Sequence, residues 1–368
     1  MALSPLNQRR LRNFTANRRA YWSLLIFCVL FGLSLFAEVI ANDKPLLVTY
    51  RGEWRMPFLR FYPETAFGGD FQTEAQYRDA EVQCLIRSGG VIDCFDDPAG
   101  ILAAIDAGSY AGEGFQKGSI LWAPIPFSYN TIVDKGGVAP GAPDRMNWLG
   151  TDDTSRDVLA RVIYGFRLSI GFALIVTLLT SVIGIVAGAV QGYFGGVTDL
   201  IFQRVIEIWG STPMLYVIII VGAVWSLNFW MLIALMVAFG WTGLVGVVRA
   251  EFLRARNFEY VRAARALGVP DWLIMFRHVL PNAMVATITL LPFVMTGTIG
   301  SLATLDYLGF GLPADLPSLG QLSRQAQQNL QMPSLAFVSF FTFAIMLSLL
   351  VFIFEGVRDA FDPRKTFQ

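Results

Sequence analysis

The chain has 368 residues, of which 54% are hydrophobic and 15% charged, and its 28 basic residues balance its 28 acidic ones. Soluble domains carry about 25% charged residues, so this composition, with a mean hydropathy of +0.52, predicts a membrane protein. The balanced charge and a pI near 6.6 argue against a nucleic-acid-binding protein. One histidine and three cysteines, with no Cys-x-x-Cys pair, are too few for the usual structural zinc sites, so we expect no metal.

Six stretches of the sequence are long and apolar enough to cross a bilayer as helices, which takes about 20 residues. The first extends from Tyr21 to Ile40 and is longer than the apolar core of a signal peptide, so we expect a retained helix at 21–41. The other five stretches are 168–190, 208–227, 229–248, 279–305 and 335–354. The sequence therefore predicts an all-α polytopic membrane protein with six transmembrane helices.

The basic residues predict that both termini are cytoplasmic, because Lys and Arg collect on the cytoplasmic flanks of membrane spans. Residues 1–20 contain five arginines, and the loop from Arg249 to His278, between the fourth and fifth predicted spans, contains six. The tail at 357–368 adds Arg358, Arg364 and Lys365. With six crossings, all three basic regions lie on the same side of the membrane.

Residues 42–163 separate the first two predicted spans and are too many for a connecting loop. The 17 acidic and 11 basic residues from Asp43 to Arg161 give this segment a net charge of about −6, which is typical of a soluble surface. We therefore expect a small domain outside the cytoplasm, inserted after the first helix, that ends in a helix leading to the second span.

Local patterns predict that this inserted domain is α+β. Residues 46–58 are expected to form a β-hairpin around Arg51-Gly52, because glycine tolerates a positive φ in the turn. The capping box at 73–76 predicts the start of a helix, which the pair Gly89-Gly90 would end. The stretch 98–143 is rich in glycine and proline and is expected to be mostly loop.

Two of the three cysteines, Cys84 and Cys94, fall in the inserted domain, whereas Cys28 lies in the first predicted span. A compartment outside the cytoplasm favours disulfides, so we predict that Cys84 and Cys94 are bonded. The alternative is a pair of free, buried thiols. Maleimide labelling before and after reduction separates the two.

The stretch from Asn147 to Arg161 precedes the second predicted span. Thr154 and Asp157 have the spacing of a capping box, followed by apolar residues at helical spacing, which predicts a short amphipathic helix on the outer membrane surface. The carboxylates of Asp152, Asp153 and Asp157 suggest a metal site or an acid–base pair. With no histidine nearby, helix caps and solvated charges are the favoured interpretation.

The loop between the fourth and fifth predicted spans is expected to fold as a helical hairpin. Gly268 would end its first helix, and Asp271 would cap a second helix that ends at Pro281. Its spacing gives the first helix one apolar face of Tyr260, Ala263, Ala264 and Leu267. Its charged residues are Glu259, Arg262 and Arg265. Small alanines let another protein approach closely, but the spacing equally fits a helix resting on lipid head groups.

Several of these motifs resemble the permease subunits of ABC importers. Glu259, Ala263-Ala264, Gly268 and Leu280-Pro281 resemble the EAA loop, which implies docking onto a separate cytoplasmic ATPase. Other segments resemble the dipeptide and oligopeptide branch of this family, namely 149–152, 156–159, 192–196, 277–282, 308–311 and 358–364. The departures, Thr154-Ser155 and Phe361, are mild.

Within that branch, the long insertion and the segments 207–209 and 305–313 most resemble the E-type permeases of Yej importers, which take up oligopeptides and the peptide-nucleotide antibiotic microcin C. The resemblance implies a multi-pass protein of the bacterial inner membrane with a permease core of five helices at 164–356 and a coupling loop at 249–282. The ATPase-docking residues would be Glu259, Tyr260, Arg262, Ala263, Ala264, Arg265, Leu267 and Gly268. The implied partners are a second, B-type permease, a cytoplasmic ATP-binding subunit, a periplasmic substrate-binding protein and the peptide.

The sequence has no G-x-x-x-x-G-K-[S/T] motif, so we expect no ATPase site in this chain and assign ATP and Mg to the partner. No other cofactor and no catalytic residue is expected. Transport by alternating access is the favoured mechanism. The alternatives are a permease of the same branch for dipeptides or nickel and, more remotely, a channel or secondary transporter. A membrane-embedded enzyme is disfavoured, because the spans hold almost no catalytic side chains.

Three smaller features of the sequence are a glycine ridge, a charged pair and the single histidine. Gly184, Gly188 and Gly192 form a ridge of small residues that favours close helix packing. Arg204 and Glu207, three residues apart, are expected to neutralise each other near the cytoplasmic edge. The single histidine, His278, has no neighbouring ligand or nucleophile and is not expected to be functional.

Overall fold

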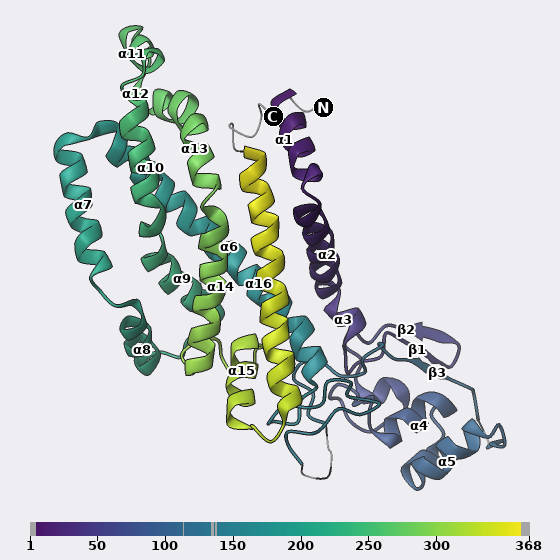
Figure 1. The fold of residues 1–368 in the computed structure, drawn as a ribbon. Helices are drawn as coiled ribbons and strands as arrows, with labels where there is room; N and C mark the ends of the chain where they lie inside the picture. The colour runs from purple at the N-terminus through teal and green to yellow at the C-terminus, as the bar shows by residue number, and fades with distance from the viewer. Residues whose placement is uncertain (1–4, 113, 134–135, 137, 362–368) are drawn as a thin grey trace. The chain divides into compact units, whose positions relative to one another are not determined.

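The computed structural model describes the chain except residues 1–4, 113, 134–135, 137 and 362–368, which are a thin grey trace in Figure 1. Arg364 and Lys365 of the expected tail lie outside the described residues. The described chain forms two compact units, which we call the helical unit (1–31 and 165–368) and the inserted unit (32–164).

Helices make up the helical unit (Figure 1). Near the N-terminus they are α1 (Pro5–Ala16) and α2 (Arg18–Leu35). The central helices are α6 (Val158–Phe194), α7 (Gly196–Gly210), α8 (Met214–Val224), α9 (Phe229–Gly240), α10 (Thr242–Ala255), α11 (Glu259–Ala266), α12 (Asp271–Leu273), the π-turn η3 (Ile274–Val279) and α13 (Leu280–Ile288). The last three are α14 (Leu291–Leu308), α15 (Leu319–Gln328) and α16 (Pro333–Phe361).

Within the described residues, four helical segments are long and apolar enough to cross a membrane. They are α2, α6, α9 with α10, and α16. Two bent pairs bring the number of candidate spans up to six: α7 with α8, bent by 62°, and α12 to α13 with α14, bent by 52°. The protein is therefore a mostly helical, multi-pass membrane protein, and each of the six predicted stretches overlaps one of these segments.

The third predicted span, 208–227, had the wrong boundaries. The structure has a helix that starts at Gly196, breaks at Ser211 and resumes as α8 at Met214. Pro213 explains the break, because proline lacks an N–H and disfavours helical backbone at the residue before it. Hydropathy alone overlooked α7, which contains Asp199, Arg204 and Glu207.

The separate amphipathic helix predicted before the second span was also wrong. α6 continues without a break for 37 residues from Val158 to Phe194. The Asp157 carboxylate caps it by accepting a hydrogen bond from the Ala160 N–H at 2.7 Å, so the cap is Asp157 itself and not the predicted box starting at Thr154.

The glycine ridge of α6 faces α10. A Cβ added at Gly184, Gly188 or Gly192 would lie 2.6, 2.8 or 2.5 Å from a backbone oxygen of Trp241, Val245 or Arg249, respectively. Real Cβ atoms do not approach an oxygen so closely, so each glycine permits the contact between the two helices.

Replacing Gly188 with leucine is expected to destabilise the helical unit by about 1–3 kcal/mol, because α6 and α10 must move apart. The matched control is Gly171→Leu on the same helix, where no described atom lies within 4 Å of the added Cβ. Thermal unfolding in detergent measures both variants. Equal stability of the two would contradict the packing role of Gly188.

The inserted unit combines a small sheet with short helices. Its three antiparallel strands are ordered β2-β1-β3, where β1 is Leu47–Tyr50, β2 is Glu53–Arg55 and β3 is Ser119–Leu121. Its short helices are α3 (Ala37–Ile40), η1 (Glu64–Phe67), α4 (Ala80–Ser88), η2 (Ile92–Phe95) and α5 (Pro98–Asp106). The predicted hairpin is confirmed, with positive φ at Arg51 and Gly52 in its turn.

One prediction inside the inserted unit was wrong. Residues 73–76 start no helix: Glu74 forms an isolated β-bridge with Pro63, the Glu64 N–H donates to the Thr73 carbonyl at 3.0 Å, and α4 begins only at Ala80. The stretch 98–143 is mostly loop in its described residues, as predicted, although it begins with α5, whose N-terminus has Pro98 in its first turn and the Asp97 carboxylate accepting from the Gly100 N–H. The predicted helix end is confirmed, because Gly89 caps α4 with a φ of 83°.

Cys84 on α4 and Cys94 on η2 are joined by a disulfide, and both are fully buried. Replacing either cysteine with serine is expected to cost about 2–3 kcal/mol of stability, because the bond closes a short loop in the unfolded chain. Maleimide labelling of the denatured protein should require prior reduction at these two positions, with Cys28 as the labelled reference. Labelling without reduction would contradict the bond.

Candidate docking hairpin

The helical unit carries a hairpin that projects from one end, where α1 and the last turns of α16 also lie (Figure 1). Its first arm is α11, and its second arm is the continuous helical segment from Asp271 to Ile288. Gly268 joins the arms with a φ of 78°, and the Val269 N–H donates to the Ala264 carbonyl at 3.1 Å. This is the glycine-capped helix end expected from the sequence.

Two residues of α11 anchor the hairpin. Val261 and Ala264 are buried in a cluster with Phe252 of α10 and with Ile274 and Val279 of the second arm. The predicted apolar face is therefore divided, because Ala264 points into the protein whereas its three companions are exposed. This packing holds α11 against the membrane helices as a rigid element.

The outer side of the hairpin is an exposed apolar surface. Leu267 at the tip is 83% exposed, and Trp272 on the second arm is 63% exposed. We call this set the hairpin surface: Phe258, Tyr260, Ala263, Leu267, Trp272 and Phe276. Exposed apolar patches of this kind are typical of protein contacts. Glu259, Arg262 and Arg265 are also exposed beside it. Trp272 and Phe276, which lie on the second arm, were not predicted from the sequence.

A polar contact links the hairpin to α6. The Tyr193 hydroxyl donates to Asp271 Oδ1 at 2.5 Å, and Arg265 Nε lies 3.6 Å from the same carboxylate oxygen. The predicted cap was therefore wrong: among the described residues, the Asp271 side chain makes no capping hydrogen bond, and it binds Tyr193 instead. Hydrogen bonding to Tyr193 raises the pKa of the Arg265 guanidinium, which stays charged.

A second contact ties α10 to the start of α7. Arg249 Nε and Nη2 each donate to one oxygen of the Asp199 carboxylate at 2.6 Å, which is a bidentate ion pair. Gln191 Nε2 of α6 donates to the Asp199 carbonyl at 3.3 Å. The C-terminal end of α6, the start of α7 and the middle of α10 are therefore joined by side-chain contacts. No sequence spacing pointed to this contact, because 50 residues separate the charges.

The second arm does not end at Pro281 as predicted. Pro281 lies in the first turn of α13, where its missing N–H is tolerated, and the π-turn η3 precedes it. His278 lies in that π-turn, and the described residues contain no cluster that could hold a metal ion.

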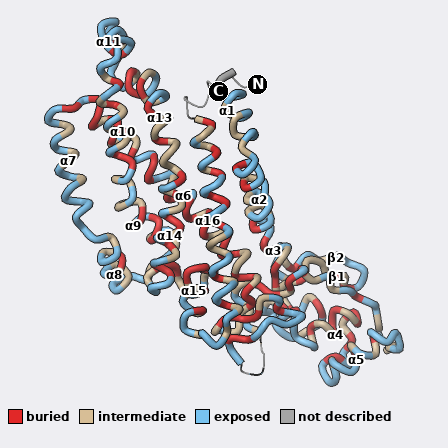
Figure 2. Tube along the Cα trace, in the orientation of Figure 1, coloured by how far each residue is buried: buried red, intermediate tan, exposed pale blue. Residues whose placement is uncertain are grey.

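The expected ion pair on α7 is present. Arg204 Nη1 donates to Glu207 Oε2 at 2.6 Å, and the two side chains remain 76% and 56% exposed. None of the described residues of α7 is buried, which Figure 2 shows as a helix without red segments.

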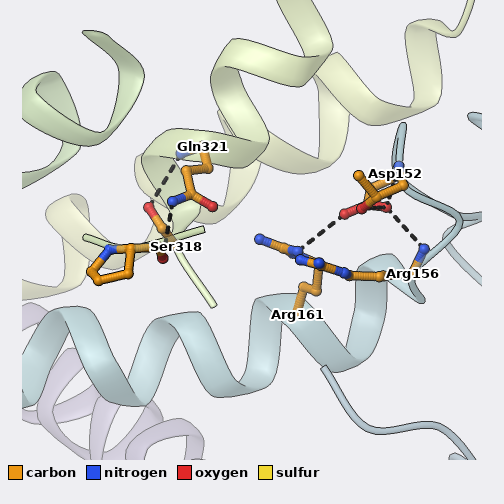
Figure 3. Close-up of polar contacts among 7 residues, drawn as sticks. Asp152, Arg156, Arg161, Ser318 and Gln321 are labelled. Atoms are coloured by element: carbon orange, nitrogen blue, oxygen red, sulfur yellow. Dashed lines mark hydrogen bonds and ion pairs between the residues drawn. The ribbon is translucent and has the colours of Figure 1, made fainter. Parts of the chain in front are cut away.

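The acidic cluster before α6 is structural. Asp152 Oδ1 accepts hydrogen bonds from the Thr154 and Arg156 N–H groups, and Asp152 Oδ2 lies 3.2 Å from the Arg161 guanidinium (Figure 3). Asp157 caps α6, as the favoured interpretation allowed, whereas Asp152 is 0% exposed and is therefore not a solvated charge. Burial with hydrogen-bond partners explains both carboxylates without a metal.

Several candidate membrane-crossing helices with a projecting, exposed hairpin define the class of multi-pass membrane proteins. Residues 181–367 match the family described as binding-protein-dependent transport system inner membrane component. The chain therefore belongs to this family of ABC permeases and is a multi-pass protein of the inner membrane.

Individual relatives agree with this family. The chain is 51% identical to the inner membrane ABC transporter permease protein YejE of Escherichia coli strain K12, covering 99% of this chain and 98% of the relative. It is 48% identical to the peptidoglycan transport system permease protein YejE of Agrobacterium fabrum, over 99% and 95% of the two chains. It is 32% identical to the oligopeptide transport permease OppC of Bacillus subtilis, over 66% and 80%. The resemblance stated from the sequence motifs is confirmed.

Proposed function

We propose that this chain is the transmembrane permease subunit of an ATP-driven importer that moves oligopeptides or peptide-like compounds, such as microcin C, from the periplasm to the cytoplasm. The observation that carries this proposal is the hairpin surface: a rigidly anchored element that exposes apolar side chains at one end of the helices. A separate ATPase would cover this surface and supply the energy. ATP and Mg would bind to that ATPase, and this chain would hold neither.

The topology that fits this proposal has six spans, with each bent helix pair counted as one. Both termini and the hairpin would then be cytoplasmic, and the inserted unit would be periplasmic. The positions of the arginines support this orientation, because the hairpin loop and the N-terminal helix are both rich in them. The disulfide of the inserted unit fits an oxidising compartment.

A second, B-type permease is the proposed neighbour of α7. The exposed side of this helix carries the Arg204–Glu207 pair, and charged groups are costly against lipid. Contact with a protein partner or a water-filled pathway removes the cost of placing these charges against lipid. We therefore place α7 so that it would face the second permease across the substrate path. Alternating access would follow from rocking of the two permeases when the ATPases close.

The proposed substrate class follows from the names of the relatives. OppC is named for oligopeptide transport, which favours peptides. The Agrobacterium relative is named for peptidoglycan transport, so peptidoglycan fragments, which contain short peptides, are a second candidate. A permease of the same branch for dipeptides or nickel stays the alternative raised by the sequence.

Affinity purification of the tagged chain from membranes in mild detergent tests the assembly. Mass spectrometry should identify an ATP-binding subunit and a second permease in comparable amounts, together with a periplasmic binding protein after chemical crosslinking. Replacing Leu267 with aspartate should remove the ATP-binding subunit and keep the second permease. Recovery of the chain without any ATP-binding subunit in the unsubstituted protein would argue against the proposal.

A further inference from the structure

A groove of about 880 Å³ opens on the inserted unit, far along the chain from the hairpin. One wall is the extended segment at 122–127, which includes Trp122 and Phe127. The other wall includes the turn at 144–147, where Asp144 Oδ1 accepts from the N–H groups of Met146 and Asn147 at 2.8 and 2.7 Å. These two hydrogen bonds fix the turn at 144–147.

Two arginines, Arg78 and Arg145, line this groove. The Arg78 guanidinium carbon lies 4.1 Å from the centre of the Phe127 ring, a cation–π contact that orients the cation. Burial lowers the pKa of Arg78, and the charge of Asp43 opposes this shift. Of the nearby carboxylates, Asp144 bonds to its own turn and Asp43 Oδ2 accepts from Thr131 Oγ1. The groove thus brings two guanidinium groups and one carboxylate, that of Asp144, together on a unit whose overall charge is acidic.

Apolar side chains stand exposed around the same groove. Ile132 and Met146 line it and are 70% and 59% exposed, and Trp148 beside the turn is 61% exposed. Arginine, tryptophan and methionine are the residue types enriched in protein–protein interfaces. Exposed apolar side chains next to two guanidinium groups are typical of a surface that contacts another protein.

We propose that this groove receives an acidic loop of the periplasmic substrate-binding protein, with carboxylates on the two arginines and apolar side chains on the rim. Guanidinium groups suit this partner because they bind carboxylates bidentately. The inference rests on the proposed function, since it requires the inserted unit to face the periplasm. The inserted unit would then capture the substrate-loaded binding protein at the membrane.

The test uses the complete transporter in lipid nanodiscs, titrated with its purified binding protein. In Arg145→Glu, the binding-protein concentration that gives half-maximal ATPase stimulation should rise about tenfold, which corresponds to about 1.4 kcal/mol. ATPase activity without binding protein should be unchanged. Arg60→Glu is the matched control, because Arg60 is an exposed arginine of the same unit that does not line the groove. Its half-maximal concentration should stay at the wild-type value.

A second measurement leaves both arginines in place. A photo-crosslinking amino acid at Met146 should link to the binding protein, whereas the same group at Trp54, an exposed strand position outside the groove, should not. A crosslink from Met146 to the second permease, or an unchanged half-maximal concentration in Arg145→Glu, would overturn the groove assignment and leave the proposed function intact. Absence of any stimulation by binding protein in the unsubstituted transporter would instead count against the proposed function.

Discussion

Replacing Gly268 with leucine is expected to abolish coupled uptake while the chain still inserts and assembles with the second permease. Gly268 has a φ of 78°, where a residue with a Cβ is strained by about 1–2 kcal/mol. No described atom lies within 4 Å of an added Cβ, so the leucine side chain would project next to Leu267 into the space assigned to the ATPase. The backbone strain and the clash of the leucine side chain with the ATPase together should weaken binding of the ATPase to the hairpin about 10- to 100-fold.

The control for this prediction is Gly108→Leu in the inserted unit. Gly108 is also exposed, has a φ of 70°, and has no described atom within 4 Å of an added Cβ. It therefore carries the same backbone strain without a place on the hairpin. ATP-driven uptake and ATPase activity of reconstituted transporters should fall only in the Gly268 variant. Normal coupled uptake in Gly268→Leu would contradict the assignment of the hairpin as the docking element.

Replacing Asp199 with alanine is expected to destabilise the helical unit by about 2–3 kcal/mol. The substitution removes a bidentate ion pair with two 2.6 Å contacts and leaves the partly buried Arg249 guanidinium without its anion. Because this pair joins α10 to α7, the loss should also loosen the link between docking and the membrane helices. Thermal unfolding of the purified chain measures the first effect, and the ratio of uptake to ATP hydrolysis measures the second.

A double-mutant cycle separates the ion pair from other effects of these substitutions. Asp199→Ala with Arg249→Ala should cost less than the sum of the single changes, because the first change already removes the interaction. Arg254→Ala is the matched control on α10: its partner Glu251 lies three residues away on the same helix, and pairs at this helical spacing contribute about 0.5 kcal/mol or less. Strict additivity of Asp199 and Arg249 would show that they do not interact.

The sequence predicted the membrane helices well because a run of about 20 apolar residues has few alternatives in a chain of this composition. It failed at α7, where charges lower the hydropathy of the helix. The structure pairs those charges, Asp199 with Arg249 and Arg204 with Glu207, and a window of hydropathy has no means of detecting a partner 50 residues away.

The hairpin was predictable in part. The glycine stop, the helix and its exposed charges follow from local spacing, so Gly268 and α11 were located correctly. The division of its two faces into buried and exposed residues was not predictable, because Val261 and Ala264 are buried in a cluster with residues of other helices, including Ala189 and Tyr193 of α6, which the spacing within one helix does not reveal. The bond from Tyr193 to Asp271 was missed for the same reason, since it spans 78 residues.

The measurement that tests the central claim most directly is uptake of a labelled oligopeptide by proteoliposomes that contain this chain, the second permease and the ATPase, with the binding protein added outside. Peptide should accumulate inside only with ATP on the ATPase side, and accumulation should cease when Leu267 is replaced with aspartate. Peptide accumulation that is independent of ATP, or that persists unchanged in the Leu267→Asp variant, would contradict an ATP-driven permease coupled through the hairpin.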